Sequence, residues 1–441
     1  MRFRGLLVAV VLLAGLGVGL YFSNKEKAAE AAKPPADASP KILALNEGDI
    51  TKIVVKKKGA DEMDLERSSG KWRITAPKAY PADQDAAIQL GYAAATVNSD
   101  SVVEDKASNL ATYGLNSPSL EVDVTAKGGK VSKLLFGDDT PTNSGSYAML
   151  EGTPRVYTVA SYAKTGLDKS PNDLRDKRLL TFDQDKLSQV ELNAKKQDIV
   201  FGRDKDHWQI VKPKPYRADG SQVDDMLRKL KDAKMDLTLS DDDAKKAATA
   251  FASGTPVATV KFTDPSGNQQ IEVRKVKDDY YAKSSTVPGV YKVTADLGAG
   301  VDKSVDDFRN KKLFDFGYND PSKIEMHVNG KFFGFQKGGD DWFSNGKKMD
   351  SVSVQSFLDK LRDLSASKFI DTGSLGAPAI DISVVSMDGK TTEKVLLAKQ
   401  GSDYVAEREN EPALYGLDSK TIDDLTQAAS DVKPAPAPAK K

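Results

Sequence analysis

The sequence predicts an α+β protein in which an N-terminal transmembrane anchor precedes three tandem, β-rich repeated domains, each with hairpins and one main amphipathic helix. Two observations carry this prediction. The chain has only three tryptophans, Trp72, Trp208 and Trp342, which are 136 (208 − 72) and 134 (342 − 208) residues apart. In addition, the segment "GKWRITAPKAYPAD" around the first recurs around the second as "DHWQIVKPKPYRAD". A fixed period of this kind indicates a repeated structural unit.

Hairpins and a helix are predicted around each tryptophan. Before it stand two short runs rich in β-branched or apolar residues, as in "ITKIVVKKKGADEMDLERSSGKW", which is typical of a β-hairpin. After it, positions i, i+3, i+4 and i+7 form one buried stripe of a helix. The stripes are Ala87, Leu90, Gly91 and Ala94, then Val223, Met226, Leu227 and Leu230, then Val354, Phe357, Leu358 and Leu361. The small residues of the first stripe predict close packing against a bulkier neighbour.

A second hairpin and two further strands follow each helix, which gives the order β-β-β-α-β-β-β-β. The first two copies end in similar segments, "DLRDKRLLTF" and "DDFRNKKLFDF". The third copy ends instead in "LDSKTIDDLTQAASDV", which predicts a terminal helix, and Trp342 lacks the Pro, Tyr and Asp that follow the other tryptophans. Such divergence is typical of the capping unit of an array. A unit of about 130 residues is large enough for a core of its own.

The predicted division of the chain follows from these repeats. It comprises a membrane anchor or signal segment at 1–24, a flexible linker at 25–44, repeat domains at 45–185, 186–320 and 321–430, and a disordered tail at 431–441.

The N-terminal segment predicts export of the rest of the chain. An uncharged, mostly apolar run from Gly5 to Phe22 is just long enough to cross a bilayer, and Arg2 and Arg4 before it favour a cytoplasmic N-terminus. We therefore expect a single-pass inner-membrane protein that contacts lipid through this helix and carries a periplasmic or extracytoplasmic body. The alternative is a cleaved signal peptide and a secreted protein, because Ala29-Glu30-Ala31 has the form of a cleavage site.

Composition excludes several classes of function. The chain has no cysteine, which excludes thiol catalysis, disulfides and Cys-ligated zinc. It has 64 basic and 64 acidic residues, so no net field attracts nucleic acid. The two histidines, His207 and His327, occupy different places in their repeats. No catalytic, cofactor-binding or metal-binding residue is therefore predicted, and no cofactor is expected.

The repeated landmark residues are the candidates for interaction or for a structural role. They are Trp72, Tyr80, Trp208, Tyr216, Trp342, Arg175 and Arg309. Trp72 and Trp208 are interpreted as core residues at a strand end, and the alternative is an aromatic platform for sugar or peptide. Arg175 and Arg309 are interpreted as partners of nearby acids or of helix ends, and the alternative is the binding of an anion. Asp83 and Asp219 suit the first turn of a helix.

Several segments of the first copy resemble a known family. "GKWRITAPKAYPADQDA", "YGLNSPSLEVDV", "KLLFGDDTP", "SYAML" and "DLRDKRLLTF" are similar to the bacterial family called domain of unknown function 4340, and the repeats extend this resemblance over roughly residues 45 to 430. The family has no assigned activity. Its members are often encoded beside subunits of ABC-type transport systems of the gliding-motility kind, so the resemblance implies an extracytoplasmic auxiliary subunit.

Three functions remain open from the sequence. The first is a non-catalytic, membrane-anchored scaffold or auxiliary subunit of a membrane complex, with protein partners in that complex. The second is a module that binds envelope polysaccharide or peptide, suggested by the recurring aromatic residues. The third is a carboxylate-based hydrolase, although no spacing singles out a pair of acids.

Overall fold

A computed structural model describes residues 40–204, 207–237, 241–265, 267–316, 321–386, 389–411 and 413–436. The predicted anchor at 1–24 and all but the end of the linker at 25–44 lie outside the described residues. Among the residues that the structure describes, no helix combines the length and apolar character needed to cross a bilayer. The chain divides into two compact units, Met1–Lys177 and Arg178–Lys441, called unit 1 and unit 2 below.

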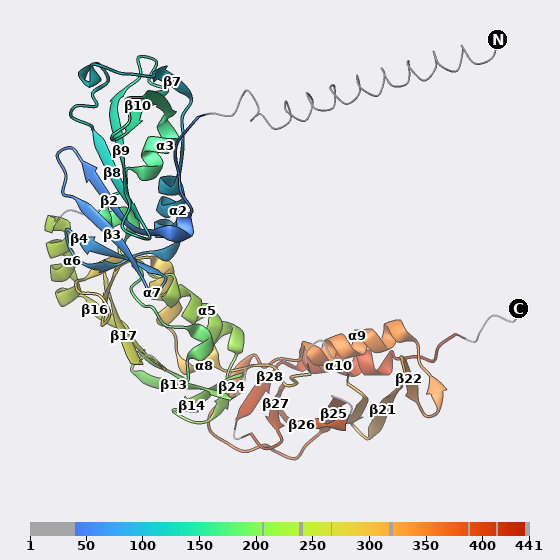
Figure 1. Cartoon of the computed structure of the whole chain (residues 1–441). Coiled ribbons are helices and arrows are strands. Elements are labelled where there is room, and N and C mark those ends of the chain that lie inside the picture. Colours follow the sequence, from blue (N-terminus) through green and yellow to red (C-terminus); the bar gives the residue numbers. More distant parts are fainter. Residues whose placement is uncertain are drawn as a thin grey trace, which may run out of the picture. The chain divides into compact units, whose positions relative to one another are not determined.

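Unit 1 holds one large antiparallel sheet, a separate two-stranded sheet of β1 and β6, and its helices (Figure 1). Its strands are β1 (Lys41–Ala44), β2 (Ile50–Lys57), β3 (Met63–Ser68), β4 (Lys71–Ala76), β5 (Tyr80–Pro81), β6 (Thr96–Asn98), β7 (Ser101–Glu104), β8 (Leu120–Ala126), β9 (Val131–Asp139), β10 (Gly145–Leu150) and β11 (Val156–Ala160). Its helices are α2 (Gln84–Ala95), α3 (Ser161–Leu167) and α4 (Pro171–Leu174), with short 3-10 turns η1 (Glu47–Asp49) and η2 (Leu110–Tyr113).

Unit 2 holds two further sheets. The elements of the second sheet region are η3 (Gln184–Lys186), β12 (Gln189–Ala194), β13 (Gln197–Asp204), β14 (His207–Lys212), β15 (Tyr216–Arg217), α5 (Gly220–Lys231), α6 (Asp241–Ser253), β16 (Thr255–Asp264), β17 (Gly267–Val276), β18 (Asp279–Ser284), β19 (Tyr291–Val293), α7 (Ala295–Val301) and α8 (Val305–Phe308). Those of the third are β20 (Lys323–Val328), β21 (Lys331–Gly338), β22 (Asp341–Ser344), β23 (Lys347–Lys348), α9 (Ser351–Arg362), β24 (Lys368–Ile370), β25 (Ile380–Ser386), β26 (Thr391–Gln400), β27 (Asp403–Arg408), β28 (Leu414–Leu417) and α10 (Ser419–Ser430).

The three large sheets share one strand order, except that the second lacks the last strand. It is β5-β4-β3-β2-β8-β9-β10-β11-β7 in unit 1, and β15-β14-β13-β12-β16-β17-β18-β19 and β23-β22-β21-β20-β25-β26-β27-β28-β24 in unit 2. Neighbouring strands of each sheet pair antiparallel, as the alternating sequence patterns predict. The β-rich α+β class and the tandem copies are therefore confirmed.

The predicted helical stripes are buried. All four stripe residues of α2, of α5 and of α9 face the cores of their sheets. The bulkier neighbour expected for α2 is an ion pair. A side-chain carbon added at Gly91 would stand 2.9 Å from Oε1 of Glu47, which is bonded to Arg67. The absence of a side chain at Gly91 lets the helix approach this pair.

The sequence pattern missed part of each copy. A second helix, α3, α7 or α10, packs beside the main one; α9 and α10 lie together on one face of the third sheet (Figure 1). Of these only α10 was predicted. The second copy also contains α6, whose Phe251 is buried under Arg274, 4.8 Å from the ring centroid. The short strands β5, β15 and β23 were missed as well, because two residues carry no readable period.

Candidate functional site

The three tryptophans lie in the cores of their sheets. The exposed fractions of Trp72, Trp208 and Trp342 are 1%, 5% and 6%. A guanidinium covers the ring in the first two copies: that of Arg67 is 4.4 Å from the Trp72 centroid, and that of Arg203 is 5.2 Å from the Trp208 centroid. An indole packed in this way offers no face to a ligand. The landmark therefore belongs to the hydrophobic core rather than to a surface platform.

The aspartate of the repeated segment caps the main helix. Asp83 accepts hydrogen bonds from the backbone N–H groups of Asp85 and Ala86, both at 3.1 Å. Asp219 accepts from Ser221 and Gln222 at 3.0 and 3.3 Å. The prediction that the third copy lacks this aspartate is wrong. Asp350 caps α9, but it follows its tryptophan by eight residues (350 − 342) rather than eleven, so the sequence comparison did not align it.

Removing a cap should have a modest, measurable effect. We expect Asp219→Ala to lower the free energy of unfolding by about 1 kcal/mol, because two N–H groups at the start of α5 lose their acceptor. Asp219→Asn keeps an acceptor oxygen and should lose only a few tenths of that amount. Calorimetric unfolding of the two variants checks this. Equal destabilisation by Ala and Asn would show that the carboxylate charge, not the cap, is what matters.

The tyrosine of the segment packs against the arginine that ends each copy. The Arg175 guanidinium lies 4.2 Å from the Tyr80 centroid in unit 1, and the Arg309 guanidinium lies 4.1 Å from the Tyr216 centroid in unit 2. The backbones meet there too, because Ala82 is bridged to Arg175 and Ala218 to Arg309. The predicted landmarks are thus brought together in pairs, and each pair fixes the end of a copy beside the start of its helix.

Arg309 makes further contacts inside unit 2. Its side chain is only 2% exposed, and its guanidinium lies 3.6 Å from the centroid of Phe369. Nη1 binds Asp306 at 2.9 Å and Asp371 at 3.0 Å. Pairing with nearby acids was predicted for this arginine, but sandwiching between two aromatic rings was not. Its contacts with Phe369 and Asp371 join the second and third sheet regions.

In the third copy, the segment around Pro434 takes the position beside the start of the main helix that Arg175 and Arg309 hold in the first two copies. Met349 is bridged to Pro434, the N–H of Asp350 donates to the carbonyl of Lys433 at 2.8 Å, and the N–H of Ala435 donates to the carbonyl of Lys348 at 2.9 Å. The tail predicted to be disordered from residue 431 is therefore ordered over this stretch, because its backbone completes the pairing that the other copies make with Arg175 and Arg309. Residues 437–441 lie outside the described part.

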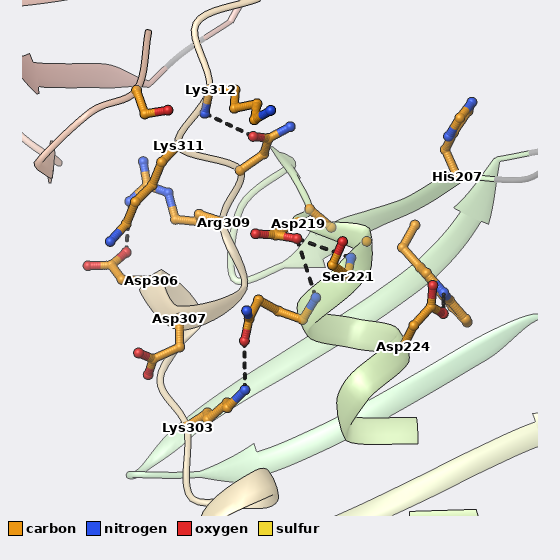
Figure 2. A pocket seen from close by; sticks show the side chains of 16 residues that line it. His207, Asp219, Ser221, Asp224, Lys303, Asp306, Asp307, Arg309, Lys311 and Lys312 are labelled. Atoms are coloured by element: carbon orange, nitrogen blue, oxygen red, sulfur yellow. Dashed lines mark hydrogen bonds and ion pairs between the residues drawn. The ribbon is translucent and has the colours of Figure 1, made fainter. Parts of the chain in front are cut away.

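A polar cleft of about 900 Å³ opens beside the start of α5 in unit 2 (Figure 2). One wall is the turn that begins α5, and the other is the stretch from Lys303 to Lys312. The ionisable groups that line it are His207, Asp219, Asp224, Lys303, Asp306, Asp307, Arg309, Lys311 and Lys312. Basic and acidic side chains are balanced, so the cleft has no strong preference for either sign of charge.

The acids of the cleft are engaged by the fold. Asp219 caps α5, and Asp306 binds Arg309. Asp224 accepts from the Trp208 indole at 3.1 Å. Asp307 accepts from the N–H and the hydroxyl of Ser304, both at 2.7 Å. Burial raises the pKa of Asp307, but these two hydrogen bonds outweigh burial and hold it below the ordinary value. Each of the four carboxylates therefore already has a structural partner.

No metal centre is formed by the described residues, since none of their His, Asp and Glu side chains gather in groups of three that could hold an ion. His207 is exposed on β14, and the His327 ring packs against Phe332 in the third sheet, with centroids 4.7 Å apart. They belong to different sheets, as their unmatched positions in the sequence indicate.

A partly buried cluster of charged groups lies where the second sheet region meets the third, inside unit 2. We call it the junction cluster; it consists of Arg217, Asp315, Glu393, Arg408, Glu411 and Tyr415. Arg217, next to the landmark Tyr216, holds both oxygens of Asp315 at 2.8 and 2.6 Å and lies 2.8 Å from Glu411. Arg408 contacts Glu393 at 3.1 Å, Glu411 at 2.9 Å and the carbonyl of Leu313 at 2.6 Å.

Charge in the junction cluster is not fully balanced. Two arginines face three carboxylates, which leaves one excess negative charge (2 − 3 = −1). Burial raises the pKa of Glu393 above its ordinary value and outweighs the opposing effects of the Asp315 N–H and of Arg408. Burial likewise raises the pKa of Tyr415, so the phenol is neutral. For Arg217, burial lowers the pKa, but Asp315, Tyr415 and Glu411 raise it further, so the guanidinium stays charged.

Glu393→Gln should therefore alter the pH dependence of stability. A carboxyl whose folded pKa is raised contributes stability below its unfolded pKa, near 4.5, and loses that contribution as pH rises through the folded value. We expect the variant to be at least as stable as the parent at pH 7 and to lack this part of the decline between pH 4.5 and 7. Thermal unfolding across that range measures it.

The second sheet supplies a natural precedent for this substitution. There the side chain of Gln269 accepts from the N–H of Thr181 at 2.9 Å, as Glu393 does from Asp315 at 2.8 Å. A large loss of stability at pH 7 in Glu393→Gln would mean that the third carboxylate is needed to hold Arg408.

Sequence reasoning missed the junction cluster. Its members are spread over almost 200 positions and follow no period. The only hint is that Arg217 stands where the first copy has Pro81. A single charged residue in a loop is too common to be informative by itself.

Fold and site together define a tandem-repeat protein whose most recognisable residues hold strands, helix starts and copy ends in place. The chain belongs to the family described as domain of unknown function (DUF4340), whose model matches residues 72–207 and 208–381, more than half of the chain. The two matches start at Trp72 and Trp208, so each covers the later part of one sheet region and the beginning of the next. No curated protein matches the chain.

Proposed function

We propose that this protein is a non-catalytic, membrane-anchored scaffold or auxiliary subunit of a membrane complex, with an extracytoplasmic body of three repeated domains at 45–185, 186–320 and 321–430. The family resemblance further favours a complex of the ABC transport type. In this proposal the segment 1–24 is the anchor, the body lies in the periplasm, and partners bind the body.

One observation carries the proposal: the residues that define the repeat are used to build it. Trp208 is in the core, Tyr216 is stacked on Arg309, and Asp219 caps α5. Residues that recur between the copies of this chain and serve the fold in this way favour a role for the shape of the copies rather than for a chemical site. Such a shape, copied in tandem, suits the presentation of surface to partners.

The two other functions that the sequence left open receive less support. The polysaccharide platform depended on Trp72 and Trp208, which are 1% and 5% exposed. The hydrolase required two free carboxylates facing one another across a cleft, and the four acids of the 900 Å³ cleft are bound to partners within the fold. Neither is proposed.

Crosslinking in intact cells, followed by isolation from membranes in mild detergent, tests the scaffold. We expect stoichiometric partners, and among them subunits of a transport system. Recovery of the protein alone at every crosslinker concentration would contradict it. Phase separation of the crosslinked sample in a nonionic detergent gives an independent reading of the anchor, because a cleaved and secreted chain would partition with the aqueous phase.

A further inference from the structure

Unit 1 exposes apolar side chains on its helices. Ile88 and Tyr92, one turn apart on α2, are 36% and 63% exposed, and Tyr162 on α3 is 78% exposed. The two helices touch where a side-chain carbon added at Gly166 would stand 3.7 Å from Cβ of Ala93. Beside this contact is a groove of about 330 Å³, whose lining includes Ala86, Leu90, Ala93 and Gly166. We call this surface the α2–α3 face.

The matching positions of unit 2 are charged or polar. Aligning the buried stripes places Ile88 with Asp224 and Gln355. The same alignment places Tyr92 with Arg228 and Asp359. Tyr162 of α3 matches Asp296 of α7. The first copy therefore has apolar or aromatic residues at three surface positions where its counterparts are hydrophilic. Unit 2 exposes apolar residues elsewhere, such as Val352 on α9 at 75% and Phe332 at 54%, but not at these three positions. An apolar set at positions that are hydrophilic in the other copies indicates a contact made by the first copy.

The second copy also shows that these positions are neighbours. Asp296, which matches Tyr162, binds Lys229 at 3.0 Å, and Lys229 matches Ala93. Lys229 in turn binds Asp225 at 3.1 Å. An ion-pair network therefore covers this helix pair in unit 2, whereas small and aromatic side chains stand in its place in unit 1.

The position at which the chain enters unit 1 points to the partner. The N–H of Ser99 donates to the carbonyl of Pro40 at 2.8 Å, and the N–H of Leu45 donates to the carbonyl of Ala95 at 2.7 Å. The described chain therefore enters unit 1 at Pro40, beside Ser99, which lies four residues beyond the end of α2 (99 − 95). The residue that lies beside the last turn of α2 is Leu45. If residues 5–22 cross the bilayer, the 17 residues from 23 to 39 connect it to Pro40, a reach of at most about 60 Å.

We propose that the α2–α3 face rests on the lipid surface to which the N-terminal segment tethers unit 1. The proposal rests on the anchor of the proposed function. Tyrosine is enriched at the membrane–water interface, where its ring enters the headgroup region and its hydroxyl stays hydrated. A tether also turns docking into an intramolecular event at high effective concentration, so three side chains and a shallow groove suffice where a free protein would need a larger surface.

Site-specific fluorescence in vesicles tests the docking. The chain has no cysteine, so Tyr92→Cys and Tyr162→Cys each give a single attachment point for a polarity-sensitive fluorophore. Arg228→Cys and Asp296→Cys are matched controls on the equivalent helices of unit 2. The full-length chain is reconstituted into vesicles of phosphatidylethanolamine and phosphatidylglycerol, with and without spin-labelled lipid, and floated to separate bound from free protein.

We expect blue-shifted emission and its loss with spin-labelled lipid at positions 92 and 162, and neither at 228 and 296. Labels at 92 and 162 that stay as water-exposed as the controls, on protein that floats, would overturn the docking and leave the anchor standing. Protein that does not float would overturn the anchor and the docking together. The same labels are also measured in native membranes. Labels that are shielded there but exposed in vesicles holding no other protein would assign the face to a protein partner and overturn the lipid contact.

Discussion

Replacing Arg217 by alanine is expected to lower the free energy of unfolding of unit 2 by about 3–5 kcal/mol. The side chain is 19% exposed, and it contacts both Asp315 and Glu411. Arg408 contacts the same two acids. Removal of Arg217 leaves Asp315, Glu393 and Glu411 with Arg408 as their shared cation. Glu393 and Glu411 are only 8% and 19% exposed, so carboxylate charge that is largely removed from water loses half of its compensation. The second and third sheet regions should then separate more readily.

Fluorescence during chemical denaturation measures this effect. In a Trp72→Phe background the remaining tryptophans, Trp208 and Trp342, both report on unit 2. Arg228→Ala is the matched control, because that arginine is 59% exposed and pairs at the surface with Asp225 and Asp232. It should change stability by less than about 0.5 kcal/mol. Equal losses in the two variants would refute a special role for the junction cluster.

Trp208→Ala is expected to destabilise unit 2 by about 3–5 kcal/mol as well, but for a different reason. The ring is 5% exposed within the second core, so alanine leaves a cavity that the neighbouring strands and α5 fill only in part. Asp224 also loses the hydrogen bond, 3.1 Å long, that it accepts from the indole N–H of Trp208. Denaturation in the Trp72→Phe background, with Trp342 as the reporter, gives the difference.

An exposed aromatic residue of unit 2 provides the comparison. Phe332 is 54% exposed on the third sheet, and Phe332→Ala should lower stability by less than about 1 kcal/mol. If Trp208→Ala proved as mild as Phe332→Ala while binding of an envelope glycan or peptide were lost, the platform interpretation would return.

The periodic features could be predicted because each is decided by nearby residues. One side of a helix carries Val223, Met226, Leu227 and Leu230, whatever they pack against. In the same way, alternation of apolar and polar residues predicts a strand from neighbouring positions alone. Asp83 and Asp219 cap helices because a carboxylate one position before the first turn reaches its N–H groups. Asp350 escaped the comparison only because the connection before α9 is three residues shorter, while the local chemistry is the same.

The candidate sites show the opposite case. Arg309 was recognised as a landmark, but its two ring contacts come from residues 93 positions before it and 60 after it (309 − 216, 369 − 309). Glu393 looks like any strand glutamate until β26 places it under Arg408. Burial and pairing of charges depend on which distant segments meet, and no short-range pattern records that.

For this protein the sequence by itself determined the number of copies, the class of fold, the stripe of each main helix and the family, because repetition and periodicity are properties of neighbouring residues. Tertiary structure alone decided that the tryptophans are core residues, that Arg217 and Arg408 share a partly buried cluster, and that the helix face of unit 1 is apolar and uncovered among the described residues. These last features follow from desolvation, which depends on how the distant parts of the chain pack.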